Sequence, residues 1–199
     1  MSSLFFYHAA MNAGKSTSLL QSAHNYTERG MKVLVVGYAG DNRAGDVLIN
    51  SRIGLTRKPD LLFGTGHNFI PELYERAATG QYHCILVDEC QFLSAWEVEG
   101  LAMICDQNDI PILCYGLKSD FQSHLFEGSK RLLELADKIV EMKTICSCGR
   151  KATMNARMSA NGDMVVDGDV VQIGGNESYQ SMCRKCYMIA QHKSLLNSK

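Results

Sequence analysis

The segment 9–16, Ala-Ala-Met-Asn-Ala-Gly-Lys-Ser, constrains the fold of this chain more than any other feature. The short apolar run 4–8 precedes it, and from Lys15 onward apolar residues recur at helical spacing until Gly30. A small-residue turn between a strand and a helix can point backbone N–H groups at a phosphate. Except for Ala9, where the pattern has glycine, the segment matches the phosphate-binding loop (P-loop) of nucleotide-binding proteins. The sequence therefore predicts a nucleoside-triphosphate site.

Three residues of this loop have expected roles. Gly14 lets the backbone approach the phosphates, Lys15 neutralises the β- and γ-phosphates, and the Ser16 hydroxyl binds Mg²⁺. Ala9 is compatible with the loop if its φ is negative, since alanine disfavours positive φ. The alternative is a chance Gly-Lys-Ser at a helix N-terminus.

A pair of acidic residues supports the nucleotide site. The apolar run 85–87 ends in Asp88, the expected second Mg²⁺ anchor, and Glu89 can polarise an attacking oxygen. The alternatives are a water-facing Asp88 at a strand end and a Glu89 that only supports the metal. We expect the acids and the P-loop at the tips of neighbouring strands. This chemistry predicts magnesium-dependent phosphoryl transfer, but it does not choose the acceptor.

The order of elements predicts an α/β fold. Strand-like and helix-like segments alternate to about residue 143, which predicts a P-loop NTPase-like core with a mainly parallel sheet and helices on both faces. The polar, basic segment 39–58 shows little periodicity, and we expect it to be a flexible excursion. We place the nucleotide-binding core at 1–143 and a second, small domain at 144–199.

Four cysteines in two tight pairs characterise the second domain: Cys146, Cys148, Cys183 and Cys186. Four thiolates can close a tetrahedral zinc shell, which leaves no open position for chemistry. Disulfide pairing is the alternative. The remaining cysteines lie in apolar segments and are expected to be reduced and buried. The sequence thus predicts a structural zinc with a long loop between the pairs.

Composition excludes several classes of function. A formal net charge of -1 argues against a protein that mainly coats nucleic acid or anionic membrane. No apolar run approaches the length of a membrane helix, and residues 1–8 do not resemble a signal peptide, so we expect a cytoplasmic location. A nucleic-acid-stimulated ATPase with a zinc module and a scaffold with a vestigial nucleotide site are the alternatives to a kinase.

The chain resembles the bacterial type II thymidine kinases nearly from end to end. The segments that carry this resemblance are AAMNAGKST at 9–17, LVDECQF at 86–92, CYGLKSDF at 114–121, IGGNESY at 173–179 and the CxxC at 183–186. The resemblance implies ATP-dependent phosphorylation of the 5′-hydroxyl of thymidine, and also of deoxyuridine, with Mg²⁺ bound to ATP. It further implies a structural Zn²⁺, a lasso loop over the nucleoside, a homotetramer and feedback inhibition by dTTP.

The resemblance also assigns roles to residues of this chain, with Glu89 as the general base. The positions that match ATP- and Mg²⁺-binding segments are Ala9, Ala10, Met11, Asn12, Ala13, Gly14, Lys15, Ser16, Arg43, Asp88, Glu89, Cys90 and Gln91. The positions that match nucleoside-binding residues are Met11, Phe92, Leu117, Phe121, Phe126, Val170, Gln172 and Tyr179. Gln172 departs from the family pattern, because many relatives have an apolar residue there.

Overall fold

A six-stranded parallel sheet forms the centre of the protein. The computed structural model describes residues 2–40, 47–170 and 179–197. The strand order is β5-β2-β6-β7-β1-β8, and every pairing is parallel. The strands are β1 (Leu4–Ala9), β2 (Val33–Tyr38), β5 (Leu61–Phe63), β6 (Cys84–Val87), β7 (Ile112–Leu117) and β8 (Lys138–Glu141). The predicted α/β class with a mainly parallel sheet is therefore confirmed.

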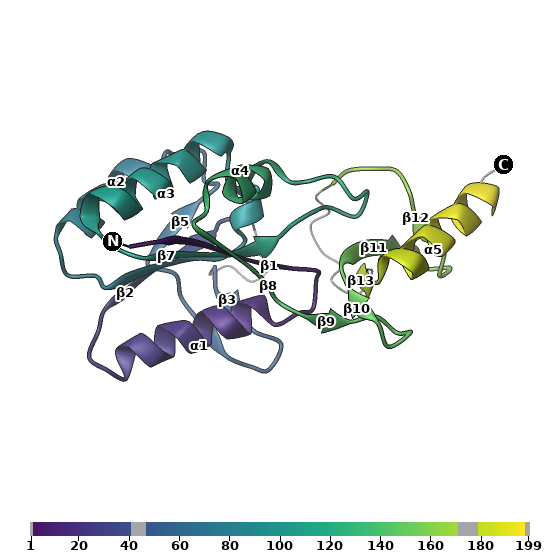
Figure 1. Cartoon of the computed structure of the whole chain (residues 1–199), viewed down its shortest axis with the longest axis horizontal. Helices are drawn as coiled ribbons and strands as arrows, with labels where there is room; N and C mark the ends of the chain where they lie inside the picture. Colours follow the sequence, from purple (N-terminus) through teal and green to yellow (C-terminus); the bar gives the residue numbers. More distant parts are fainter. Residues whose placement is uncertain (1, 41–46, 171–178, 198–199) are drawn as a thin grey trace.

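Helices cover both faces of this sheet (Figure 1). Helix α1 (Lys15–Thr27) packs on one face, while α2 (Ile70–Ala78), α3 (Ala95–Asn108) and α4 (Glu127–Leu135) pack on the other. The central strands β2 and β6 are almost continuous runs of valine, leucine and isoleucine and are buried along their length. Such runs are typical of strands with both faces covered.

Helix α3 begins where the sequence predicts. The backbone N–H and the hydroxyl of Ser94 both donate to the Glu97 carboxylate at 2.8 Å. The Ser94 side chain in turn accepts the backbone N–H of Glu97, the third residue of the helix, which completes a capping box. The helix buries Val98 and Leu101 against the sheet. The local signal and the tertiary packing agree at this helix.

Part of the segment expected to be a flexible excursion is ordered. A short hairpin joins β3 (Ile49–Asn50) to β4 (Thr56–Arg57), and Ile49 is buried with the apolar residues of α1. Two-residue strands give no periodic signal, so the pattern could not reveal them. Residues 41–46 lie outside the described residues.

From residue 144 the chain forms smaller antiparallel sheets, and we call residues 144–197 the C-terminal module. A hairpin pairs β9 (Thr144–Ile145) with β10 (Lys151–Ala152). A second sheet has the order β12-β11-β13, formed by Met164–Val165, Met154–Met158 and Tyr179–Met182. Helix α5 (Arg184–Asn197) packs on this sheet, and Figure 1 shows the module extending away from the core. No helix in the described ranges is long and apolar enough to span a membrane.

Candidate active site and metal centre

The P-loop connects β1 directly to α1. Ala9 is the last residue of β1 and lies beside Leu117 of β7. Ala9 is not among the residues with positive φ; Asn12 (φ 63°) and Gly14 (φ 76°) adopt the left-handed conformation instead. The loop therefore requires left-handed backbone at its fourth and sixth positions, so alanine is compatible with the first.

Asp88 faces the start of α1. It follows β6 directly, and the Ser16 hydroxyl donates to its Oδ2 at 3.3 Å. Its Oδ1 is buried and is the one such side-chain atom in the described residues with no hydrogen-bond partner. Burial raises the pKa of Asp88 to about 7, and the negative charge of Glu89 acts in the same direction. A buried carboxylate oxygen without a partner, beside a hydroxyl, fits the ligands that Mg²⁺ prefers.

The sequence predicts that Asp88, Glu89 and the P-loop lie at the tips of neighbouring strands. The structure differs, because their strands are not adjacent in the sheet. Strand β7 lies between β6 and β1 in the sheet. The carboxyl ends of these parallel strands still meet at one edge, where ligands bind in open α/β sheets. The Ser16–Asp88 contact shows that the two strand ends face the same site.

Lys15 lies among these carboxylates. Burial lowers its pKa, and the charges of Glu89 and then Asp88 oppose the shift. Both carboxylates are thus close enough to interact electrostatically with the Lys15 ammonium. The arrangement gathers one cation and two acids at the loop, the set needed to bind a magnesium-bound triphosphate.

Glu89 is held in a constrained position. Its backbone is left-handed (φ 51°) at the start of a short 3-10 helix, η1 (Cys90–Phe92). The Gln91 amide donates to the Glu89 carboxylate, and the Gln91 carbonyl oxygen accepts the backbone N–H of Leu117 at 3.0 Å. Left-handed non-glycine residues are uncommon and often lie at functional sites. Gln91 therefore links the acid at the end of β6 to the end of β7.

Close packing around Gly116 of β7 holds Gln91 in this position. A Cβ added at Gly116 would lie 2.6 Å from both the Cys90 Sγ and the Gln91 Oε1. Cys90 is fully buried in the apolar core, and burial raises the pKa of its thiol well above the ordinary value. The Cys90 side chain is thus a packing group, so a contact from this residue to ATP would have to come from its backbone.

The aromatic residues that the resemblance assigns to the nucleoside form two groups. Phe92 and Phe126 meet edge to face with ring centroids 5.7 Å apart, and Tyr38 stacks on Phe92 at 4.5 Å. Phe121 is fully buried, with the Arg157 guanidinium 5.4 Å from its ring centroid. Tyr38 is not among the predicted site residues, and its ring contact with Phe92 places it in the first of these two groups.

The remaining nucleoside positions are spread over three elements. Met11 lies within the P-loop and Leu117 ends β7, and both are half-buried. Tyr179 begins β13. Val170 is exposed. Arg43 and Gln172 lie outside the described residues.

Four cysteine sulfurs converge in the C-terminal module. The Sγ atoms of Cys146, Cys148, Cys183 and Cys186 all lie within 4.8 Å of one another. Zinc–sulfur bonds of about 2.3 Å place tetrahedral sulfurs about 3.8 Å apart, and the Cys148–Cys183 separation is 3.6 Å. None of the eight cysteines forms a disulfide, so that alternative is wrong. The donor set fits a structural zinc.

The backbone around the cluster favours thiolates. Backbone N–H groups of Cys148 and Cys183 lower the pKa of Cys146 to about 6. Hydrogen bonds with the other three thiols instead raise the pKa of Cys186 to about 12. Four adjacent sulfurs cannot all carry charge without a cation, and zinc would supply one.

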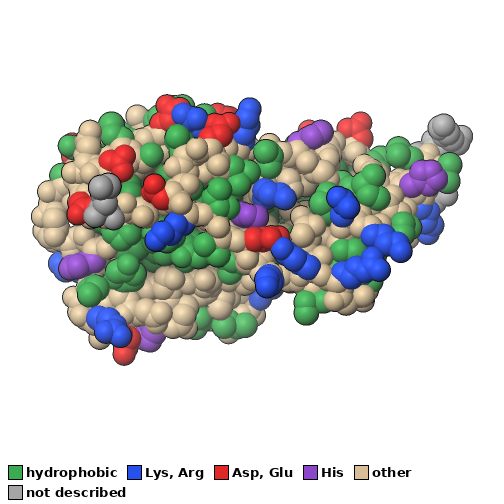
Figure 2. Space-filling model, in the orientation of Figure 1, with side chains coloured by type: hydrophobic (Ala, Val, Ile, Leu, Met, Phe, Trp, Pro, Cys, Tyr) green, Lys and Arg blue, Asp and Glu red, His purple; other side chains and the backbone are tan. Residues whose placement is uncertain are grey.

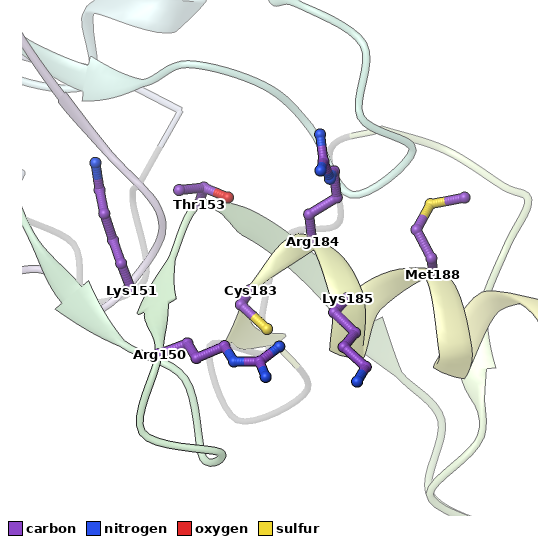
Figure 3. Close-up of a pocket in the computed structure, with 7 residues that line it drawn as sticks. All are labelled: Arg150, Lys151, Thr153, Cys183, Arg184, Lys185 and Met188. Atoms are coloured by element: carbon purple, nitrogen blue, oxygen red, sulfur yellow. The ribbon is translucent and has the colours of Figure 1, made fainter.

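A cavity of about 590 Å³ opens beside the cysteine cluster. It is lined by Arg150, Lys151, Thr153, Cys183, Arg184, Lys185 and Met188 (Figure 3). Lys and Arg side chains gather over this part of the molecule in Figure 2. Cationic side chains beside thiolates offset the negative charge of a four-cysteine zinc centre. The cavity therefore places basic side chains beside the predicted metal centre.

Comparison with known proteins identifies the family. Residues 2–187 match the family model described as thymidine kinase. The chain belongs to the thymidine kinase family. It is 49% identical over 200 residues to a protein named thymidine kinase from Photorhabdus laumondii, covering 100% of this chain and 98% of the relative. It is 52% identical over 185 residues to a thymidine kinase from Shewanella oneidensis, covering 93% and 96%. The family assignment makes this chain an enzyme of the kinase class.

Solved structures of two Pif1 proteins share a distant likeness with this member of the thymidine kinase family. The Pif1 helicase from Candida albicans overlaps 72% of this chain and 36% of its own, with a TM-score of 0.41 and 14% identity. A likeness of this size carries no conclusion about function.

Proposed function

We propose that this thymidine kinase family member transfers the γ-phosphate of ATP to the 5′-hydroxyl of thymidine, and also of deoxyuridine. The product from thymidine is dTMP. The observation that carries the proposal is the convergence of Lys15, Ser16, Asp88 and Glu89 at the ends of β1 and β6. The names of the relatives, at about 50% identity over nearly the whole chain, support the choice of acceptor.

The P-loop holds the triphosphate in this proposal. Backbone N–H groups at the start of α1 contact the phosphates, and Lys15 offsets their negative charge. Ser16 and Asp88 would hold a Mg²⁺ ion, whose charge stabilises negative charge that develops during phosphoryl transfer. Asp88 suits this role because its Oδ1 is buried and has no partner within the described part of the chain.

Glu89 is the general base. Its carboxylate accepts the proton of the nucleoside hydroxyl as that oxygen attacks the γ-phosphorus, and ADP leaves. Gln91 orients the carboxylate, since its amide donates to Glu89 while its carbonyl oxygen is fixed by Leu117. A base must be held within hydrogen-bond reach of the proton it takes.

The other parts of the proposal concern binding and assembly. Met11, Phe92, Leu117, Phe121, Phe126, Val170, Gln172 and Tyr179 contact the nucleoside, with the lasso loop of the C-terminal module above it. We divide the chain at residue 143 into a nucleotide-binding core and a zinc-binding domain. The enzyme is a cytoplasmic homotetramer that dTTP inhibits. The resemblance to type II thymidine kinases supports these points.

A kinase assay with one matched pair of variants tests the proposal. Turnover is measured with Mg-ATP and each natural nucleoside, and we expect it with thymidine and deoxyuridine but not with purine nucleosides. Glu89→Gln should retain ATP binding and lose about 10²- to 10⁴-fold in kcat, as expected for loss of a general base. Glu75→Gln, the same change at an exposed position of α2, is the control. Equal rates on purines would refute the specificity, and near-normal turnover of Glu89→Gln would refute the base.

A further inference from the structure

A buried asparagine of the C-terminal module joins two segments of the core. Asn155 lies on β11 and is only 4% exposed. Its Oδ1 accepts the backbone N–H of Met11 in the P-loop at 2.7 Å. Its Nδ2 donates to the backbone carbonyl of Ser119, just after β7, at 2.9 Å. One amide group thus connects the P-loop to the segment that follows β7.

The neighbouring strand of the module completes the contact with the P-loop. Ser181 of β13 is the direct cross-strand partner of Asn155, and its hydroxyl donates to the backbone carbonyl of Met11. Both carbonyl and N–H of Met11 are therefore bonded by two facing residues of one small sheet. This arrangement fixes Met11 at two points.

A second contact joins the module to the segment after β7. The hydroxyl of Tyr187, a buried residue of α5, donates to the carbonyl of Phe121 at 2.6 Å. Arg157 of β11 lies over the Phe121 ring. The module thus contacts the P-loop through Asn155 and Ser181, and the Phe121 segment through Tyr187 and Arg157.

We propose that Asn155 is a positioning residue that orients the P-loop for the nucleotide, with Ser181 as its partner. Asn155 engages the Met11 N–H, so this group does not point at the phosphates, and the N–H groups of the following residues remain for them. A loop held in its binding conformation before the ligand arrives loses less conformational freedom on binding. The inference rests on the proposed function only in requiring that the P-loop binds nucleotide phosphates.

Loss of this clamp should weaken nucleotide binding. Asn155→Ala leaves the Met11 N–H and the Ser119 carbonyl without their partner, so the nucleotide itself must then order the P-loop on binding. We expect the Kd for a fluorescent ATP analogue to rise by about tenfold in Asn155→Ala and by about fivefold in Ser181→Ala. Nucleotide binding is measured without thymidine, because Met11 is also assigned to the nucleoside.

Two further variants serve as comparisons. Tyr187→Phe removes only the hydroxyl that contacts Phe121, so we expect it to raise the KM for thymidine more than the Kd for the nucleotide. Asn161→Ala removes an exposed asparagine on the β11–β12 turn and should change neither. A nucleotide Kd that rises in Asn155→Ala but stays nearly unchanged in Tyr187→Phe is a result that general loosening of the module would not produce.

The experiment uses full-length, zinc-loaded protein and measures nucleotide binding separately from turnover. If Asn155→Ala does not fold, Ser181→Ala, which removes one hydroxyl at a half-buried position, decides the question. Nucleotide affinity within twofold of the unaltered protein would overturn the proposal, and so would an equal loss of nucleotide affinity in Tyr187→Phe. If the unaltered protein binds ATP but does not phosphorylate thymidine, the proposed function fails, while the effect of Asn155→Ala on ATP affinity still tests the clamp.

Discussion

The core and the C-terminal module are stabilised in different ways. The core has apolar clusters on both faces of its sheet, formed by strands and helices along most of residues 4–137. The module has two small clusters, centred on Cys146, Ala152 and Cys183 and on Ala156, Met164 and Tyr187. A unit of this size buries too little apolar surface to be stable alone. Its stability must come from the metal and from its contacts with the core.

Removing the metal should therefore have the largest effect. Structural zinc contributes an apparent free energy on the order of 10–16 kcal/mol in small zinc modules. We expect a strong chelator to abolish hydrogen-exchange protection in the strands β9 to β13 and in α5, to leave the β1, β2, β6 and β7 amides protected, and to eliminate thymidine phosphorylation. Hydrogen exchange read by mass spectrometry, with metal analysis before and after chelation, checks this.

Substitutions of cysteine provide the matched control for chelation. Cys183→Ser should reproduce the loss of zinc and of protection in the module. Cys105→Ala, which removes a buried thiol of the core, should leave the zinc content unchanged. If the module keeps its hydrogen-exchange protection after all zinc is lost, zinc is not what stabilises it, and the contrast with the core is wrong.

One glycine in the core and one in the C-terminal module are required for different physical reasons. Gly116 of β7 has no room for a side chain, since an added Cβ would lie 2.6 Å from the Cys90 Sγ and the Gln91 Oε1. Gly149, in the turn between the first cysteine pair and β10, has φ 83° and nothing within 4 Å of an added Cβ. Close packing thus explains glycine at the first position, and backbone conformation explains it at the second.

Alanine at these two glycines should have different effects. We expect Gly116→Ala to lower the free energy of unfolding of the core by about 1–3 kcal/mol through overpacking. It should also lower kcat, because it displaces the Gln91 that orients Glu89. Gly149→Ala should reduce stability by about 1–2 kcal/mol through backbone strain, with kcat nearly unchanged. Chemical denaturation and steady-state kinetics measure both, and equal losses of kcat would contradict the comparison.

Local signals in the sequence predicted most of the core. The buried runs of β2 and β6 and the Ser94–Glu97 capping box each depend on residues close together in the chain. The same holds for each cysteine pair of the C-terminal module. The β3–β4 hairpin escaped prediction, because its order depends on the burial of Ile49 against α1.

The prediction of the candidate site was limited by tertiary contacts. The P-loop and Asp88 were recognisable from their local patterns, whereas the insertion of β7 between their strands depends on sheet topology. Asn155 had no signal in the sequence, because its two partners lie 144 and 36 residues away. A sequence pattern reveals the periodicity of a single helix or strand. It cannot reveal contacts between residues far apart in the chain, because these form only when the whole chain has folded.

An exposed ion pair between the two regions should contribute least. Lys151 of β10 donates to Glu141 of the edge strand β8, and about two-fifths of each side chain is exposed. The hydrogen bond from Lys151 lowers the pKa of Glu141. Because the folded pKa lies below the ordinary value of 4.5, this stabilisation is fully present above that pH. It is lost as the pH falls through the folded pKa.

A double-mutant cycle measures this contribution. Lys151→Ala and Glu141→Ala, singly and together, should give a coupling free energy of about 0.2–1 kcal/mol at pH 7, and added salt should reduce it. The Arg131–Glu99 pair, which joins α4 to α3 within the core at 2.9 Å, provides a comparison of similar exposure. We expect similar, salt-sensitive coupling from both pairs, because solvent screens each of them. A coupling free energy above about 2 kcal/mol for Lys151–Glu141 alone would mean that surface charge holds the module to the core, and the buried contacts of Asn155 and Tyr187 would then be secondary.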